Sequence, residues 1–259
     1  MTAHEKIEPG LRLETTDDGF LGGALKILQP KRGYRAGLEA VFLAASIPAA
    51  SGDKALEAGC GVGVASLCLA RRVGDVAVTG VEIEPELAEL GCENASRNRL
   101  GHMVNISLSD VCRAREEPDF GCNTQDHVFA NPPFFTSGSA RRSDDPLKNR
   151  AHICDPEDLD SWVRFLVSLA APTGTVTIIY RAEGLGELLH LLNRRVGNCH
   201  VYPLYPRASQ PASRVIVQGI KGSRAPATLL RGLVLHGDGD AFTSEAQSIL
   251  RHGAALRLM

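Results

Sequence analysis

The chain has 259 residues with a formal net charge of −2 at pH 7, and 44% of its residues are hydrophobic. This mixture is typical of a globular protein and excludes collagen-like and low-complexity chains. Because no apolar run approaches the roughly 20 residues that span a bilayer, and the first thirty residues are too polar for a secretory signal, we expect a cytoplasmic protein.

The first fifty residues are expected to form a cap in front of the main domain. Gly22, Gly23 and Gly33 interrupt a segment that favours a β-hairpin, and an apolar stretch over Glu39–Ile47 predicts a helix. We therefore predict an amino-terminal cap over residues 1–50, packed on a core domain over residues 51–259.

From residue 54 onward, short β-branched runs alternate with longer amphipathic stretches. Pro85 suits the first turn of a helix, and Asp155 followed by Pro156 is typical of another helix start. Gly174 is expected to end the unit that begins there. The predicted order is a strand over 54–58, a helix over 64–73, a strand over 76–82, a helix from 85, strands over 104–108 and 126–130, a helix from 156, a strand over 175–180 and a helix over 183–196.

The remaining sequence changes character, with strands predicted over 199–204, 213–220 and 229–235 and no full helix between the last two. Strand–helix alternation followed by paired strands predicts an α/β fold. We expect a doubly wound, Rossmann-like sheet that is mostly parallel, with an antiparallel strand at its carboxy-terminal edge. A ligand is then expected beyond the carboxyl ends of the strands, at the switch point beside the strand over 54–58. The tail over 224–259 indicates no function.

Glycines occupy alternate positions in the run EAGCGVG over residues 57–63, between a predicted strand and a predicted helix. They allow a tight turn and let a ligand approach the backbone, and the following helix start offers free N–H groups. The dinucleotide fingerprint needs a further glycine, but that position falls on Val64 or Ser66, so a dinucleotide is the weaker choice. A tight turn without a ligand is the alternative. These glycines are Gly59, Gly61 and Gly63.

Acidic residues end the next two predicted strands. Glu82 follows Gly63 by 19 residues and can accept hydrogen bonds from both hydroxyls of a ribose. Asp110 can accept one from the amino group of an adenine. The alternatives are a solvated loop acid for Glu82 and a cap or turn residue for Asp110.

The run VFANPPF over residues 128–134 is an apolar strand that leads directly into a rigid turn. Because two prolines fix the backbone and remove donors, the amide oxygen of Asn131 and the carbonyl oxygen of Pro132 offer two acceptors to one –NH₂ group. Phe134 offers a flat face to a planar ring or amide. At the end of a strand in such a sheet, this pattern indicates a site for an exocyclic or amide nitrogen.

These motifs resemble the Asn-Pro-Pro-(Tyr/Phe) class of S-adenosylmethionine-dependent methyltransferases, whose members modify adenine N6, guanine N2 or glutamine amide nitrogens. The resemblance implies S-adenosylmethionine as the cofactor, although Phe134 and Glu57 stand where Tyr and Asp are frequent in the class. The residues implied in gripping the target amine are Asn131, Pro132, Pro133 and Phe134. The residues implied in binding the cofactor are Arg35, Glu39, Glu57, Gly59, Gly61, Gly63, Glu82, Ile83, Asp110 and Asn131.

The cap is implied to close over the cofactor through Arg35 and Glu39. An ordinary surface pair of these two residues at i, i+4 is the alternative.

Within this class the chain is similar to the bacterial valine-tRNA adenine N6-methyltransferase group over roughly residues 20–220. The likeness rests on the stretches over 25–35 and 37–44, on a second aromatic residue, Phe135, and on basic residues that recur after it. The basic residues implied in RNA binding are Arg141, Arg142, Lys148 and Arg150. As a solvated loop they would need no partner.

Charge is distributed unevenly along the chain. Residues 1–130 hold 13 Lys and Arg against 19 Asp and Glu, whereas residues 131–259 hold 15 against 11. A basic half of this kind would attract a polyanion such as RNA, with chance unevenness as the alternative.

Seven cysteines include no Cys-x-x-Cys pair, so the sequence predicts neither a zinc ribbon nor a redox dithiol. We expect reduced thiols that pack as small hydrophobic groups, and no bound metal.

The combined prediction is an S-adenosylmethionine-dependent N-methyltransferase that modifies the N6 amine of an adenine in tRNA. Guanine N2 of rRNA and a protein glutamine amide are alternatives, because the same turn can hold either –NH₂ group. A cofactor-binding module without catalysis is less favoured, because Asn131 and Pro132 are both intact.

Overall fold

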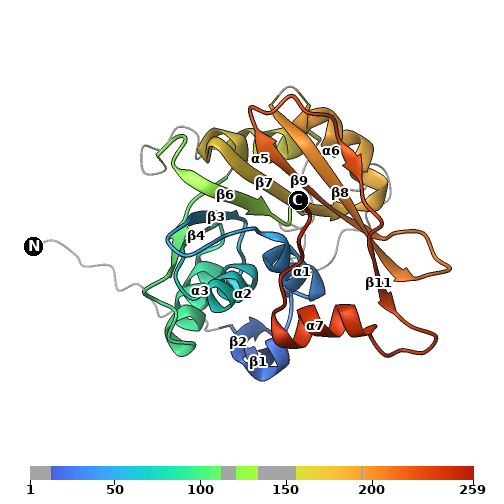
Figure 1. Ribbon diagram of the computed structural model, residues 1–259. Helices are drawn as coiled ribbons and strands as arrows, with labels where there is room; N and C mark the ends of the chain where they lie inside the picture. Colours follow the sequence, from blue (N-terminus) through green and yellow to red (C-terminus); the bar gives the residue numbers. More distant parts are fainter. Residues whose placement is uncertain (1–12, 112–120, 134–155, 194) are drawn as a thin grey trace, which may run out of the picture.

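The computed structural model describes residues 13–111, 121–133, 156–193 and 195–259 (Figure 1). Within these ranges, nine strands form one sheet beside a separate two-stranded hairpin. The order across the large sheet is β10-β8-β9-β7-β6-β3-β4-β5, and β11 also pairs with β8. The strands of this sheet are β3 (Lys54–Ala58), β4 (Ala77–Glu82), β5 (Val104–Leu108), β6 (Gln125–Ala130), β7 (Ala170–Arg181), β8 (Val196–Arg207), β9 (Arg214–Lys221), β10 (Thr228–Leu229) and β11 (Leu233–His236).

Strands β5, β4, β3, β6 and β7 run parallel to one another, and β9 is inserted antiparallel between β7 and β8. The strand order reverses between β3 and β6, so the switch point lies beside β3 as predicted. The predicted fold class is therefore confirmed. The antiparallel strand is not the outermost one, because β10 and β11 pair in parallel with the far side of β8.

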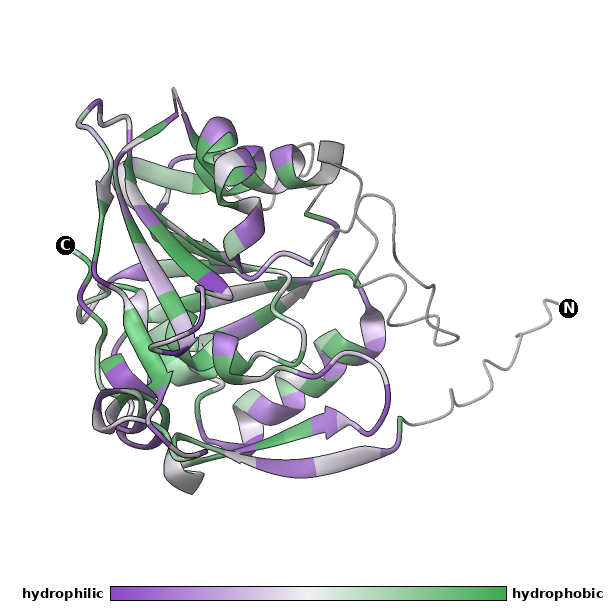
Figure 2. Cartoon of the chain, turned by 90° about the vertical axis from the view of Figure 1, so that its right-hand side faces the viewer, coloured by the Kyte–Doolittle hydropathy of each residue, from purple (hydrophilic) through white to green (hydrophobic). Residues whose placement is uncertain are grey.

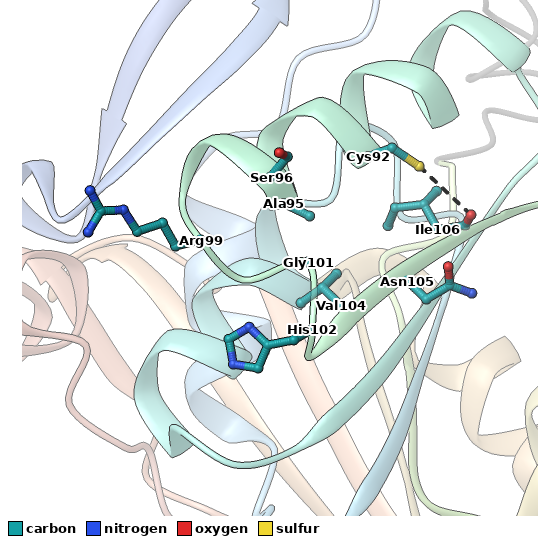
Figure 3. A pocket seen from close by; sticks show the side chains of 9 residues that line it. All are labelled: Cys92, Ala95, Ser96, Arg99, Gly101, His102, Val104, Asn105 and Ile106. Atoms are coloured by element: carbon teal, nitrogen blue, oxygen red, sulfur yellow. Dashed lines mark hydrogen bonds between the residues drawn. The ribbon is translucent and has the colours of Figure 1, made fainter.

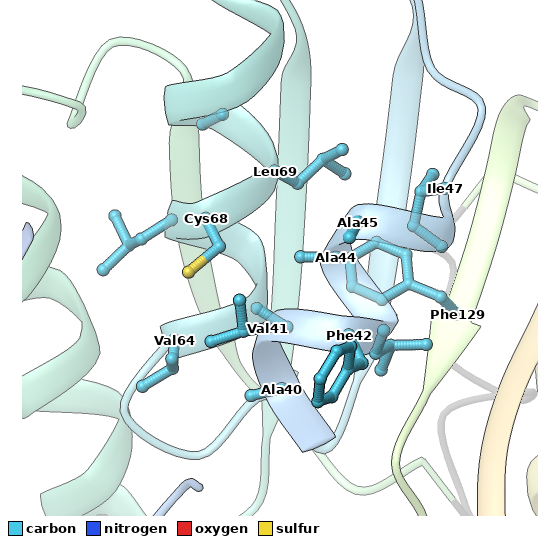
Figure 4. Close-up of a cluster of buried hydrophobic side chains, with 14 of the residues drawn as sticks. Ala40, Val41, Phe42, Ala44, Ala45, Ile47, Val64, Cys68, Leu69 and Phe129 are labelled. Atoms are coloured by element: carbon cyan, nitrogen blue, oxygen red, sulfur yellow. The ribbon is translucent and has the colours of Figure 1, made fainter. Parts of the chain in front are cut away.

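Helices cover both faces of the sheet, with α1, α2 and α3 on one face and α5 and α6 on the other (Figure 1). Alternate residues of a strand face opposite sides: Phe129 packs with α1 and α2 (Figure 4), whereas Val128 and Ala130 pack in the cluster around α5. The helices are α1 (Leu38–Ser46), α2 (Val64–Val73), α3 (Pro85–Arg97), α5 (Pro156–Leu169) and α6 (Leu185–Leu192).

Hydrophobic and hydrophilic residues alternate along the flanking helices (Figure 2), as expected for elements that bury one side. Among the helices of the described ranges, none combines the length and apolar character needed to cross a bilayer.

A hairpin and a helix are present in the segment over which the cap is predicted. Strands β1 (Thr15–Phe20) and β2 (Leu25–Pro30) pair antiparallel around a short turn, η1 (Leu21–Gly23), in which Gly22 and Gly23 have positive φ. Asn94 of α3 and Asn98, which caps the end of α3, hold β2 in place. The side-chain amide of Asn94 accepts from the Leu28 N–H and donates to its C=O, and that of Asn98 does the same with Lys26. The cap and the core therefore share one hydrophobic cluster.

The tail contains a helix that the sequence patterns did not predict, α7 (Ser244–His252), which packs against α1 and η1 (Figure 1). Thr243 caps its start by accepting from the Ala246 N–H, and Gly253 ends it with φ 66°. Beyond it, the Leu256 N–H donates to Ala45 O at 2.8 Å. The chain end thus returns from the sheet edge to the cap.

Three predicted boundaries were wrong. Gly174 does not end a unit but lies inside β7, where a Cβ would come within 3.0 Å of three carbonyl oxygens. The helix predicted over 183–196 is shorter, because Val196 already begins β8. The strand predicted over 229–235 is interrupted, because β10 ends at Leu229 and β11 begins only after Gly232, whose φ is +80°.

Candidate active site

The glycine turn between β3 and α2 is held by two aromatic side chains. Gly59 and Gly61 have φ of +64° and +55°, which L side chains rarely adopt. A Cβ on Gly59 would lie 2.3 Å from Trp162 Cη2, and one on Gly61 would lie 2.6 Å from Tyr34 Cε1. We expected the missing Cβ atoms to make room for a ligand. At these two positions they make room for rings of the protein itself.

Glu82 connects the end of β4 to this turn. Its Oε2 accepts from the Gly61 N–H at 2.7 Å, and its Oε1 accepts from the N–H groups of Ile83 and Glu84 at 2.9 and 3.0 Å. Burial raises the pKa of the Glu82 carboxyl, while these three bonds act in the opposite direction. The result is a rigidly oriented acid at the position where a ribose is expected.

Glu57, at the base of the turn, binds α2. Its Oε2 accepts from the backbone N–H of Ser66 at 2.9 Å and from the Ser66 hydroxyl at 2.5 Å. Ser66 is the third residue of α2, so the carboxyl satisfies one of the free N–H groups of the first helical turn. Burial raises the pKa of Glu57 to about 8. Its contacts in the described structure support the turn, and contact with the cofactor stays a prediction.

Tyr34 is the main residue of this region that the sequence motifs did not single out. Burial raises the pKa of its hydroxyl well above the usual range, and the nearby carboxyls of Glu57 and Glu82 raise it further. The phenol therefore stays protonated beside two acidic side chains. The only signal in the sequence was its place between Gly33 and Arg35, ahead of the cap helix.

Arg35 and Glu39 each bind a different part of the protein. Arg35 donates to Asp18 Oδ2 at 2.5 Å and to Thr16 Oγ1 and Pro30 O at 2.8 Å, which anchors the hairpin. Glu39 Oε1 lies 3.3 Å from Arg214 Nε at the start of β9. Their place in cofactor binding stays a prediction, and the structure gives each of them a structural partner instead of the other.

Two exposed apolar side chains flank the end of β4. Ile83 is 54% exposed and Leu108 is 57% exposed, and Leu108 is the register partner of Glu82. The Ser109 N–H donates to Glu82 O at 2.8 Å, which brings Asp110 to the same edge. Such a pair of side chains suits a flat, partly apolar ring with an amino group, and adenine has both properties.

Asn131 directly follows β6, next to β3 at the switch point. Its amide oxygen is buried without a hydrogen-bond partner among the described residues, although such an acceptor costs about 1–3 kcal/mol when it stays unpaired. An amine that donates to Asn131 would remove this cost. Pro132 beside it is buried, whereas Phe134, Phe135 and the basic residues Arg141, Arg142, Lys148 and Arg150 lie outside the described residues.

A hollow of about 500 Å³ lies away from these residues, between α3 and the start of β5 (Figure 3). It is at the amino end of β5, whereas Glu82 and Asn131 are at the carboxyl ends of their strands. The hollow is therefore separate from the candidate active site. Its lining includes Cys92, Ser96, Arg99, His102 and Asn105.

A Rossmann-like sheet that carries a glycine turn, an acid at the next strand end and an Asn-Pro-Pro turn at its switch point defines a class I S-adenosylmethionine-dependent methyltransferase. Residues 38–144 match the family model of the methyltransferase small domain. The chain belongs to the family of S-adenosylmethionine-dependent methyltransferases that includes the tRNA1(Val) (adenine(37)-N6)-methyltransferases. It is thus an enzyme that uses S-adenosylmethionine.

Sequence relatives support this family, and a solved structure shares the fold. The chain is 30% identical over 175 residues to a tRNA1(Val) (adenine(37)-N6)-methyltransferase of Yersinia enterocolitica, covering 67% of each chain. It is 25% identical over 178 residues to the protein of the same name from Musicola paradisiaca, covering 67% of this chain and 68% of that one. The structure of a predicted O-methyltransferase from Agrobacterium tumefaciens shares the fold, with a TM-score of 0.71, 24% identity and coverage of 84% and 98%.

The residues present fit S-adenosylmethionine. Glu82 is oriented at a strand end, Ile83 and Leu108 flank it, and the buried amide oxygen of Asn131 has no hydrogen-bond partner within the described part of the chain. The candidate residues from Glu57 to Asn131 lie at the carboxyl ends of four adjacent strands, whereas Arg35 is bound in the hairpin, and the role of each in the site stays a prediction.

Proposed function

We propose that this enzyme transfers the methyl group of S-adenosylmethionine to the N6 amine of an adenine in tRNA. The observation that carries the proposal is the buried amide oxygen of Asn131 at the switch point of the sheet, which no described residue pairs with. The relatives are named for this substrate, and the second half of the chain is basic.

Asn131 and Pro132 act on the amine. The lone pair of an adenine amine delocalises into the ring, so the nitrogen is a poor nucleophile. Two oxygen atoms that accept hydrogen bonds from the amine localise its lone pair on the nitrogen and direct it at the methyl carbon. Positioning of this kind contributes several kcal/mol, within the ~7–11 known for well-oriented intramolecular reactions.

When bound, S-adenosylmethionine supplies an activated methyl group on a sulfonium, which leaves as a neutral thioether. The nitrogen gains the methyl carbon and loses one proton. Neither the Asn131 amide nor the Pro132 carbonyl is basic enough to keep that proton, so it passes to solvent. Glu82, Ile83 and Leu108 hold the donor in position during this step.

A base in a folded tRNA must leave its stack before Asn131 can reach it, which costs a few kcal/mol. An adenine in a single-stranded loop has the lowest cost. Position 37, which the names of the relatives specify, is therefore the first site to test.

The test is methyl transfer from labelled S-adenosylmethionine to three substrates in parallel: unmodified valine tRNA, rRNA and total protein from cells that lack the enzyme. Nucleosides and amino acids are then separated and identified by mass. We expect N6-methyladenosine in the tRNA, and none when adenine 37 is replaced by guanine. Label in rRNA guanine N2 or in protein glutamine, with none in tRNA, would overturn the proposal.

A further inference from the structure

Arg181 ends the strand next to the Asn-Pro-Pro turn. In the parallel β6–β7 register Ala130, the last residue of β6, lies opposite Ile178, so β7 continues three residues further and ends with Arg181 at the same carboxyl edge as the Asn-Pro-Pro turn. On its other side Arg181 is the register partner of Arg214 in β9. Arg181 thus stands at the catalytic edge, one strand away from Asn131.

Within the part of the chain that the structure describes, Arg181 differs from Arg207 and Arg214 in having no carboxylate partner. Arg214 lies 3.3 Å from Glu39, and Arg207 lies 2.9 Å from Asp240. Among the described residues Arg181 makes no ion pair, and its guanidinium lies 5.8 Å from the ring centroid of Tyr180. Its positive charge is therefore available to a ligand.

The Nε atom of Arg181 is buried without a hydrogen-bond partner in the described structure. A buried donor of this kind costs free energy unless a ligand pairs with it. The same edge holds the unpaired acceptor of Asn131. One unpaired acceptor and one unpaired cationic donor on adjacent strands match a ligand that carries an amine and an anion close together.

We propose that Arg181 binds a backbone phosphate of the RNA substrate next to the nucleotide whose amine Asn131 grips. This inference rests on the proposed function. Every nucleotide carries a phosphate, whereas a protein glutamine carries no obligatory anion near its amide. Arginine holds phosphate through two parallel N–H bonds, and a strand end holds it more rigidly than a loop.

The phosphate contact also has a function in the reaction. Phosphate contacts fix the register of a nucleic acid but do not read its sequence. Arg181 would hold the phosphate of the nucleotide and Asn131 would hold the amine of its base. These two contacts would fix both ends of the nucleotide while its base is unstacked. Removal of Arg181 should therefore weaken RNA binding and leave cofactor binding intact.

The experiment compares Arg181→Ala and Arg181→Lys with the control Arg224→Ala. Arg224 is exposed and lies near the amino-terminal edge of the same sheet, so its loss changes the net charge equally but away from the site. The measurements are tRNA affinity across a salt series, single-turnover methyl transfer, and calorimetric affinity for S-adenosylmethionine. Unchanged cofactor affinity and melting temperature confirm that each variant is folded.

For Arg181→Ala we expect at least tenfold weaker tRNA binding and a salt slope smaller by about one charge. Arg181→Lys keeps the charge but not the paired N–H groups, so it should keep the slope and lose part of the affinity. Arg224→Ala should stay within twofold of the parent.

A neutral methylphosphonate in the tRNA tests the pairing directly. Replacing the phosphate on either side of the target nucleotide, one at a time, should weaken binding to the parent at one of the two positions. At that position the methylphosphonate should not weaken the binding of Arg181→Ala any further, because the substitution and the methylphosphonate remove the same contact.

If Arg181→Ala binds and methylates tRNA as Arg224→Ala does, the phosphate site is wrong while the proposed function stands. If the parent enzyme methylates protein glutamine and no RNA, both are wrong.

Discussion

Gly61 donates its backbone N–H to the carboxyl of Glu82 at 2.7 Å, which ties the glycine turn to the end of the neighbouring strand. The two motifs assigned to the cofactor are therefore one mechanical unit. A change in either should affect the geometry of the other as well as its own contact with the cofactor.

Replacing Glu82 with Gln tests this unit. Gln keeps only one acceptor oxygen, so its –NH₂ group would face either the Gly61 N–H or the N–H groups of Ile83 and Glu84. Cofactor affinity should therefore fall by about 10- to 100-fold, which is roughly 1.4–2.8 kcal/mol. The chemical step at saturating cofactor should change much less. Calorimetry and single-turnover transfer measure the two effects, with Glu86→Gln, an exposed acid in the first turn of α3, as the control. Equal losses in both variants would show that only net charge matters.

Asn131→Ala should give the opposite pattern. It removes one of the two acceptors that we propose for the amine, and loss of one preorganised partner in other enzymes costs roughly 10²–10³ in kcat, about 2.7–4 kcal/mol. Cofactor affinity should drop much less, because Glu82 and the turn remain. The matched control is Asn105→Ala, an exposed asparagine on β5. Transfer by Asn131→Ala within threefold of the parent would mean that the turn is structural.

Gly61→Ala and Gly74→Ala separate backbone strain from side-chain crowding. Both glycines have positive φ, but a Cβ on Gly74 meets nothing within 4 Å, whereas one on Gly61 meets Tyr34 at 2.6 Å. Gly74→Ala should cost about 1–2 kcal/mol of unfolding free energy. Gly61→Ala should cost more and should also weaken cofactor binding. Urea denaturation and calorimetry provide both measurements, and equal costs at the two positions would contradict the contact with Tyr34.

The carboxyl of Glu57 makes stability depend on pH. Its pKa of about 8 lies above the value of an exposed Glu, so the folded protein binds this proton more tightly than the unfolded chain does. The stabilisation is complete below the unfolded pKa and is lost as pH rises through about 8. Between about pH 5 and 8, the contribution of Glu57 to the free energy of unfolding should decrease as pH rises, with a slope approaching 1.4 kcal/mol per pH unit.

Glu57→Gln keeps the shape and removes this titration. The difference in unfolding free energy between Glu57→Gln and the parent should therefore shift in favour of the variant as pH rises. Urea denaturation at several pH values measures it. A constant difference across this range would show that Glu57 titrates normally.

Removal of the buried contact of α7 tests the attachment of the tail. Ile249 is 3% exposed, and Ile→Ala in a core costs about 2–5 kcal/mol. We expect Ile249→Ala to speed hydrogen exchange in the hairpin over residues 15–30, because α7 packs on η1 between the two strands. Arg251→Ala, at an exposed position of the same helix, is the control. Unchanged exchange in the hairpin would mean that the cap is held by α3 alone.

Strand positions and the glycine turn were predictable from local patterns. The strands over 54–58 and 104–108 and the helix over 64–73 have the predicted bounds, because apolar periodicity and glycine or proline breaks act over a few neighbouring residues. The position of Asn131 at the switch point followed from the order of these elements and the geometry of parallel sheets.

Contacts between distant segments were decided only by the tertiary structure. The ring of Tyr34 lies on Gly61, and Arg35 binds Asp18 while Glu39 binds Arg214. The sequence spacing of Arg35 and Glu39 also allows these two residues to pair with each other at i, i+4, so spacing alone could not identify their actual partners.

The tail likewise combines local contacts with contacts to distant segments. Thr243 and Gly253 cap α7 through local contacts. The packing of α7 on η1 depends instead on β8, β10 and β11, which lead the chain to the sheet edge. Local free energies of a few tenths to 1 kcal/mol select helix or strand. The free energy gained by burying apolar surface between remote segments is larger, and it selects which of these segments pack together.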